Sequence, residues 1–286
     1  MLRLHPRVRL YLDAVIEKCV DGGGPLVSLI LFGSAVTGGF ADAASDVDLI
    51  FVLSDGAGLE SRRRLNAAVR ELEILHGLAG DSLRQRGTFE SLVDKITGNA
   101  HSVFVCTREE LLSANAAGIF GIPAAQALFV DRVVVPSIVF SAVTVWGEEL
   151  LGEIVLPPIR RLDVFKSFFS LANQVWVSVS LFVVLPGATR LAMGALKKSV
   201  HHYYFCSHGR PAAIEKEIEF FHGKYGASPA LEQLISLRRE YRESFRFAVR
   251  CMPAVARLHM RAALDNQFPR AIGKRQPEQI EDDQCG

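Results

Sequence analysis

The sequence predicts an α/β fold in its N-terminal half and an all-helical fold in its C-terminal half. Strand-like apolar runs occur only before the paired prolines Pro157 and Pro158, and segments with helical periodicity dominate after them. The 286 residues are 49% hydrophobic, enough to bury the core of one large domain or two modest ones. We therefore expect domains at residues 1–155 and 159–272, followed by a mobile tail at 273–286.

The N-terminal half is predicted to alternate helices with strands. Apolar side chains recur at helical spacing after Pro6 and end at the run of glycines at 22–24. Two continuous apolar runs then indicate buried strands. A stretch with helix formers and one charged face precedes a third, β-branched run that leads into the charged "REELL". The expected elements are a helix at 6–20, strands at 25–32 and 46–53, a helix at 58–77 and a strand at 102–107. Residues 127–151 mix both patterns, and the pattern does not separate them.

The C-terminal half is predicted to contain helices at 160–184, 187–205, 210–226 and 228–252, separated by proline and glycine. Residues 168–186 are nearly long enough for a membrane span. Asn173, Gln174 and serines interrupt this run, so we expect a buried helix instead.

Charge and cysteine usage favour a cytoplasmic location. The net charge is +1, which disfavours a nucleic-acid-coating protein, and the charged N-terminus does not resemble a signal peptide. The five cysteines are scattered singly without a CxxC pair, as expected of free thiols in a reducing compartment.

Two aspartates stand at the start of the second predicted strand, in "SDVDLIFVL". Side chains two residues apart on a strand share a face, so Asp46 and Asp48 project together while Val47 turns into the core. Paired carboxylates repel each other, and a divalent cation relieves that repulsion. Rigid oxygen ligands of this kind suit Mg²⁺, which completes its shell with phosphate and water.

Gly33 and Ser34 follow the first predicted strand. A glycine there permits a sharp turn and close approach of a phosphate to the backbone, and the serine adds a hydroxyl donor. Taken alone, Gly33-Ser34 is most simply an ordinary turn. Taken alone, the pair Asp46 and Asp48 could lie on a solvated strand edge. Together, however, a phosphate cradle and a metal clamp indicate phosphoryl or nucleotidyl transfer.

The string "FGSAVTGGFADAASDVDLIFV" resembles the signature of the polymerase β type of nucleotidyltransferase superfamily, and the order of the halves resembles its antibiotic-modifying bacterial members. The resemblance implies a mixed-sheet catalytic domain followed by a helical domain. It also implies that Asp46 and Asp48 hold Mg²⁺ and act in catalysis, and that Gly33 and Ser34 contact the nucleoside triphosphate.

Active members of that superfamily carry a third carboxylate on a neighbouring strand. The strand expected at 102–107 has His101 and Ser102 at the corresponding place. Glu90, Asp94 and Asp131 are the alternatives if the strands lie differently.

Other clusters were weighed against simpler interpretations. Histidines and a cysteine in "KKSVHHYYFCSH" have the spacing of a metal site, but without a second ligand pair we favour core or surface histidines. Lys197 and Lys198 are either phosphate ligands or a solvated helix end. Four arginines recur every three or four residues and predict one basic stripe on a helix: Arg239, Arg242, Arg246 and Arg250. An ordinary amphipathic helix is the simplest interpretation of this stripe, and a grip on a phosphorylated or polyanionic acceptor is the alternative.

The resulting hypothesis is an Mg²⁺-dependent enzyme that transfers a nucleoside monophosphate, AMP from ATP, to an acceptor hydroxyl and releases pyrophosphate. The acceptor is expected to be a small molecule or a protein, because near-neutral charge disfavours RNA. The alternative is an inactive nucleotidyltransferase fold that serves as a nucleotide-binding or toxin–antitoxin-like interaction module.

Overall fold

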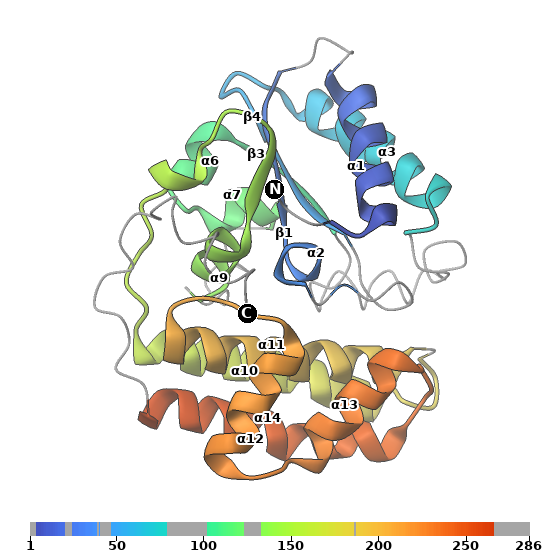
Figure 1. The fold of residues 1–286 in the computed structure, drawn as a ribbon, viewed down its shortest axis with the longest axis vertical. Helices are drawn as coiled ribbons and strands as arrows, with labels where there is room; N and C mark the ends of the chain where they lie inside the picture. Colours follow the sequence, from blue (N-terminus) through green and yellow to red (C-terminus); the bar gives the residue numbers. More distant parts are fainter. Residues whose placement is uncertain are drawn as a thin grey trace.

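The computed structural model contains an α/β part and a helical part, stacked one above the other in Figure 1. It describes residues 4–20, 25–38, 40, 47–78, 102–122, 133–185 and 187–265. The statements below concern these residues.

The α/β part is built on a four-stranded sheet in the order β3-β2-β1-β4. Strand β1 pairs antiparallel with both β2 and β4, whereas β2 and β3 run parallel. The strands are β1 (Leu26–Phe32), β2 (Asp48–Leu53), β3 (Val103–Thr107) and β4 (Val143–Gly147). The three strands predicted from apolar runs are therefore confirmed.

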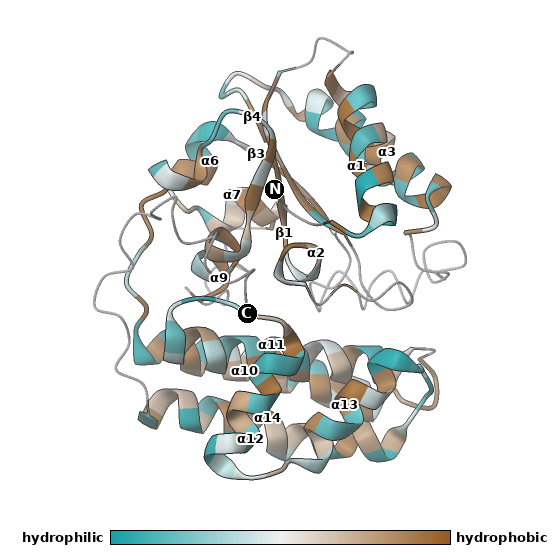
Figure 2. Cartoon of the chain, in the orientation of Figure 1, coloured by the Kyte–Doolittle hydropathy of each residue, from teal (hydrophilic) through white to brown (hydrophobic). Residues whose placement is uncertain are grey.

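The sheet is covered on both faces, which explains why β1 and β2 are continuous apolar runs. In β1, Leu29 and Leu31 point to one core cluster, and Ile30 and Phe32 point to another. Figure 2 shows the hydrophobic strands between helices of mixed character. The helices of this part are α1 (Pro6–Val20), α2 (Ser34–Thr37), α3 (Leu59–Leu75), α6 (Arg108–Leu112), α7 (Ala116–Phe120) and α9 (Val134–Ser141).

Helices α1 and α3 pack against the first of these faces, while α7 and α9 contribute to the cluster on the second. The ambiguous segment 127–151 contains α9, then β4, and then a short 3-10 helix at Leu151–Glu153. Helix α9 is rich in β-branched residues, so tertiary packing overrides its strand propensity. Val135 and Val139, one helical turn apart, are both buried.

The helical part consists of five helices among the described residues: α10 (Arg161–Ser180), α11 (Ala188–His208), α12 (Ile214–Tyr225), α13 (Pro229–Arg239) and α14 (Phe245–Asp265). Helix α11 is the most deeply buried element of this part, and its Phe205 contacts Phe140 of α9 with ring centroids 5.9 Å apart. One continuous apolar cluster includes strand residues such as Ile30 and helical residues such as Leu196. The two parts therefore share a core.

The prediction of a fully buried helix at 168–186 is wrong in one respect. Helix α10 buries Leu171 and Val175, but Phe169 and Trp176 on its opposite face are exposed. The helix is amphipathic because its buried face alone meets α11 and α14. No helix in the described ranges has both the length and the apolar character to cross a membrane.

The single helix expected at 228–252 is also wrong, because the chain leaves the helix between Arg239 and Phe245. Glu243, in this break, accepts hydrogen bonds from the backbone N–H groups of Gly187 and Thr189 and from the Thr189 hydroxyl. The four arginines interpreted as one stripe consequently lie on two helices and the segment between them.

Glu243 should stabilise the fold in a pH-dependent way. Burial raises the pKa of its carboxyl group, but hydrogen bonds, first from the Thr189 hydroxyl and then from Tyr241, outweigh burial and bring the pKa below its ordinary value of 4.5. Because the folded pKa is depressed, this contribution is present above that value and is lost as the pH falls through the folded pKa. We expect Glu243→Gln to lower the free energy of unfolding by about 1 kcal/mol near neutral pH.

Urea denaturation of the wild type and of Glu243→Gln, at neutral pH and near pH 3, measures this difference. The difference in unfolding free energy between the wild type and Glu243→Gln should be smaller at the acidic pH. Glu240→Gln is the matched control, since this exposed carboxylate in the same segment forms no ion pair or side-chain hydrogen bond with the described chain. A gap that persists in acid would contradict the electrostatic explanation.

Candidate active site

The turn after β1 brings Gly33 directly against Asp48. Phe32, the last residue of β1, pairs across the sheet with Asp48, the first residue of β2. Gly33 has a φ of +75°, and a Cβ added to it would lie less than 3.0 Å from Oδ2 of Asp48. The carboxylate thus occupies the space that any other residue at position 33 would fill.

Asp48 projects from the sheet as the sequence predicted, and Val47 before it is buried against the α1 and α3 side. The alternation of β2 places Asp48 on the same face as Ile50 and Val52. The residue is only partly buried. Its partner in the motif, Asp46, lies outside the described residues.

Ser34 is the first residue of α2, immediately after Gly33. The Gly33 carbonyl accepts hydrogen bonds from the backbone N–H groups of Val36 and Thr37, both at 3.1 Å. The Thr37 hydroxyl also donates to this carbonyl, at 3.3 Å. The turn is therefore fixed by its own hydrogen bonds, and Gly33, Ser34 and Asp48 form one cluster.

The position beside Asp48 on the neighbouring strand belongs to Ser102, as the sequence predicted for the strand at 102–107. The backbone N–H of Leu49 donates to the Ser102 carbonyl at 2.7 Å, and Leu49 pairs with Val103 in the parallel register. The other candidates for a third carboxylate, together with the adjacent histidine, lie outside the described residues: Glu90, Asp94, His101 and Asp131.

Glu73 on α3 is a buried carboxylate that the sequence interpretation missed. The Ser102 hydroxyl donates a hydrogen bond to Glu73, so this acid holds the start of β3 next to Asp48. Glu73 lies on the α1 and α3 side of the sheet. Burial, and secondly the charge of Glu73, raise the pKa of Tyr11 on α1. A glutamate directly after the buried Leu72, on the apolar face of the predicted helix, was the signal that could have identified it.

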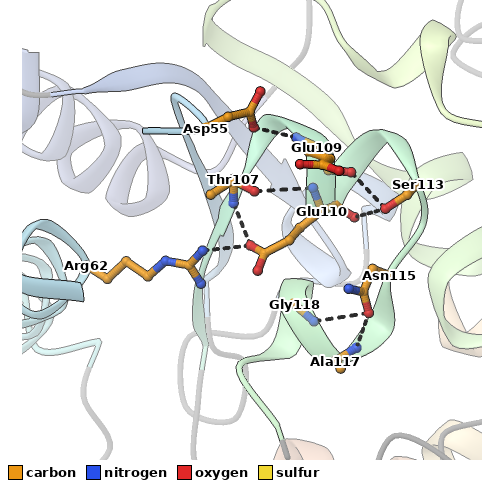
Figure 3. Close-up of polar contacts among 9 residues, drawn as sticks. All are labelled: Asp55, Arg62, Thr107, Glu109, Glu110, Ser113, Asn115, Ala117 and Gly118. Carbon is orange, nitrogen blue, oxygen red and sulfur yellow. Dashed lines mark hydrogen bonds and ion pairs between the residues drawn. The ribbon is translucent and has the colours of Figure 1, made fainter. Parts of the chain in front are cut away.

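Glu110 is another carboxylate close to β3, but its role is structural. Figure 3 shows that it accepts from the Thr107 backbone N–H at 2.7 Å and pairs with Arg62 at 2.8 Å. Thr107 in turn caps the start of α6, completing a capping box. Thr107 ends β3 at the opposite end from Ser102, about 16 Å away along the strand at 3.3 Å per residue. Glu110 therefore belongs to the far edge of the sheet.

Three histidines of the helical part, His201, His202 and His259, make contacts within the helical bundle. His201 pairs with the fully buried Glu217, and the Ser167 hydroxyl lies between His202 and His259. No group of three or more potential metal ligands occurs within the described ranges of the chain. This arrangement fits the core interpretation of the "KKSVHHYYFCSH" histidines. Lys197 and Lys198 are half-buried on α11.

No model of a known protein family matches the chain, and neither does any curated protein. Among solved structures, the chain is similar to the spectinomycin adenyltransferase of Enterococcus faecialis, determined with ATP and spectinomycin. The likeness covers 89% of this chain and 98% of the other, with a TM-score of 0.50 and 12% sequence identity. At this identity the comparison shows a shared fold. The expected fold, an α/β part with a mixed sheet followed by helices as in that adenyltransferase, is thereby confirmed.

Proposed function

We propose that this protein is an Mg²⁺-dependent nucleotidyltransferase that transfers AMP from ATP to a hydroxyl group of a small molecule or protein, with release of pyrophosphate. The observation that carries the proposal is the contact between the Asp48 carboxylate and the bare backbone of Gly33. The solved structure with the same fold is an adenyltransferase that binds ATP and a small acceptor. A cytoplasmic location fits a substrate such as ATP.

The residues present fit a hard divalent cation. Asp48 offers carboxylate oxygens directly beside the backbone of Gly33, and carboxylates are the protein ligands that Mg²⁺ prefers. In this proposal Asp46 and Asp48 hold the ion. When bound, Mg²⁺ neutralises charge on the phosphates and on the leaving pyrophosphate.

The protein groups bind and orient the triphosphate. Gly33 lets a phosphate oxygen approach the backbone closely, and the Ser34 hydroxyl donates a hydrogen bond to it. The acceptor oxygen then forms a bond to the α-phosphorus, the bond to the β-phosphate oxygen breaks, and the hydroxyl proton is released. Glu73 acts as a positioning residue, because its hydrogen bond to Ser102 fixes the strand next to Asp48. Lys197 and Lys198 are further candidates for contacts with the phosphates.

A second candidate function is a non-catalytic nucleotide-binding module, including a toxin–antitoxin-like partner protein. The specific observation in its favour is Ser102, which occupies the position beside Asp48 where active relatives of the resembled type carry an acid.

The deciding experiment measures pyrophosphate release from ATP and Mg²⁺ with a panel of aminocyclitols, aminoglycosides, simple sugars and hydroxyl-bearing proteins. Acceptor-dependent release that requires Mg²⁺ supports the transferase. Saturable ATP binding without release across the whole panel supports the module. Absence of both binding and release contradicts both proposals.

A further inference from the structure

Helix α10 exposes a row of large apolar side chains. Leu162, Phe165, Phe169 and Trp176 are 62%, 57%, 59% and 63% exposed, although a helix in a helical domain normally buries such residues. Their spacing of three, four and seven residues places them on one face of the helix. The rings of Phe165 and Phe169 are in edge contact, with centroids 4.9 Å apart.

Helix α14 continues this apolar surface. Near the start of α10, Phe168 contacts His259 near the end of α14. Just after the end of α10, Phe182 contacts Phe245 at the start of α14. The two helices are therefore antiparallel neighbours. The rotation of 100° per residue places the exposed apolar residues of α14 on the side toward α10. We call the combined surface the apolar seam, formed by Leu162, Phe165, Phe169, Trp176, Val249, Met260 and Leu264.

A line of arginines borders the apolar seam on α14. The arginines of this line are spaced by four, seven and four residues along α14. This spacing places them within one narrow sector of the helix, next to the seam and away from α10. We call this set the arginine row: Arg246, Arg250, Arg257 and Arg261. No carboxylate of the described chain forms an ion pair with any of the four.

Part of the arginine row is held in place by α12. Arg257 donates to the carbonyl of Tyr225 at 2.8 Å, and the guanidinium of Arg261 lies 4.8 Å from the centre of the Tyr225 ring. These contacts orient the side chains without neutralising their charge. The row is thus a one-sided positive border that is held in place at Arg257 and Arg261.

The apolar seam is large enough for a specific interface. With areas of roughly 150–250 Å² per aromatic side chain, the seven residues expose on the order of 700 Å². The largest apolar patch of a typical monomer is about 300–600 Å², and a standard interface buries about 800 Å² on each partner. The seam therefore exceeds the background expected of an unpartnered surface.

We propose that the apolar seam binds an amphipathic helix of a partner protein, and that this helix carries acidic residues along one flank. The line between two antiparallel helices accepts a third helix by ridges-into-grooves packing. The seam runs about 21 Å from Leu162 to Trp176, the length of roughly four helical turns. Acidic residues on one flank would pair with the arginine row. The inference is independent of the proposed catalytic function.

Charge argues against two other occupants. If two copies of this chain paired through their seams, the arginine row of one copy would face either the arginine row or the far flank of α10 in the other copy. That flank carries Lys166, Ser170 and Asn173 and no acidic residue. An anionic lipid surface would favour cations on both borders of the apolar residues. Here four arginines line one border, and Lys166 is the single cation named on the other. A one-sided positive border matches a helix with a one-sided acidic flank.

The test uses the full chain and two labelled synthetic helices of about 18 residues, long enough to span the seam. Both carry leucines along one face, with glutamates on one flank in the first and lysines in the second. Fluorescence anisotropy should show saturable binding of the glutamate peptide, at least about tenfold tighter than binding of the lysine peptide. Added salt should weaken it.

The decisive variants reverse charge at Arg246, which is exposed, and at Arg250, which is half-buried. The double variant Arg246→Glu with Arg250→Glu should weaken binding of the glutamate peptide at least about tenfold and strengthen binding of the lysine peptide. Phe169→Ser should weaken binding of both peptides. Arg63→Glu with Arg70→Glu, on exposed positions of α3, is the matched control and should change nothing. Circular dichroism and thermal melting verify that each variant folds.

Three results would overturn the proposal. The first is no binding of the glutamate peptide, or binding that ignores the arginine variants. The second is sedimentation with phosphatidylserine vesicles that Phe169→Ser abolishes while the peptide does not bind, which would identify a membrane surface. The third is a dimer in sedimentation velocity that Phe169→Ser dissociates, which would identify a second copy as the occupant.

Discussion

Replacing Asp48 by asparagine should lower the rate of the proposed nucleotidyl transfer at least about 100-fold while leaving the fold intact. The substitution keeps the shape of the side chain beside Gly33 but removes the negative charge proposed to hold Mg²⁺. Loss of one such electrostatic contact lowers kcat by about 100-fold to 1,000-fold. Because Asp48 is only partly buried, the free energy of unfolding should change by less than about 1 kcal/mol. Initial rates of pyrophosphate release at saturating ATP, together with urea denaturation, measure both quantities.

Asp55→Asn is the matched control for this experiment. Asp55 follows β2 at its other end, where its carboxylate accepts from the backbone N–H of Glu109 at 2.7 Å. The control should lose a little stability and no activity. Isothermal titration should also show that Asp48→Asn loses Mg²⁺-dependent ATP binding while Asp55→Asn keeps it. Equal rates for Asp48→Asn and the wild type would refute the assignment of Asp48.

Gly33→Ala is expected to have the second largest effect. The added methyl group would overlap the Asp48 carboxylate, and the φ of +75° is unfavourable for any residue with a Cβ. A residue forced into this region costs of order 1–3 kcal/mol, and the overlap must in addition displace the carboxylate. We expect a loss of about 2 kcal/mol in unfolding free energy and at least about tenfold weaker ATP binding.

Gly38→Ala separates these two causes. Gly38, at the end of α2, has a φ of +82°, but a Cβ there would have no atom within 4 Å. The control variant therefore carries the backbone strain without the overlap. Weakened ATP binding confined to Gly33→Ala would assign the effect to Asp48. Equal weakening in both variants would show that backbone strain alone is responsible.

The parts of the fold that the sequence predicted are those specified by local pattern. Strands β1 and β2 are continuous apolar runs because both faces of the sheet are covered. The turn after β1 needs a positive φ at position 33, and the glycine there signals that turn in the sequence. The same local signals placed Asp48 beside Gly33 and Ser34. The adjacency needs only an antiparallel pairing of two strands that are close in sequence.

The parts that it missed depend on distant contacts. Nothing in "RREYRES" stops a helix, and the break between α13 and α14 coincides with hydrogen bonds from Gly187 and Thr189 to Glu243, more than fifty positions along the chain. Helix α9 forms against its propensity because Val135 and Val139 enter the core. Likewise, the link between Glu73 and Ser102 exists only once β3 lies parallel to β2.

The shared core has a consequence for any attempt to exchange parts of this molecule. Leu196 of the helical part belongs to the same apolar cluster as Ile30 of the sheet. A helical half grafted from another protein would have to reproduce that packing surface, since mismatched volumes leave cavities or overlaps. Changes to the proposed acceptor preference are therefore more accessible through point substitutions within the existing halves than through exchange of a whole half.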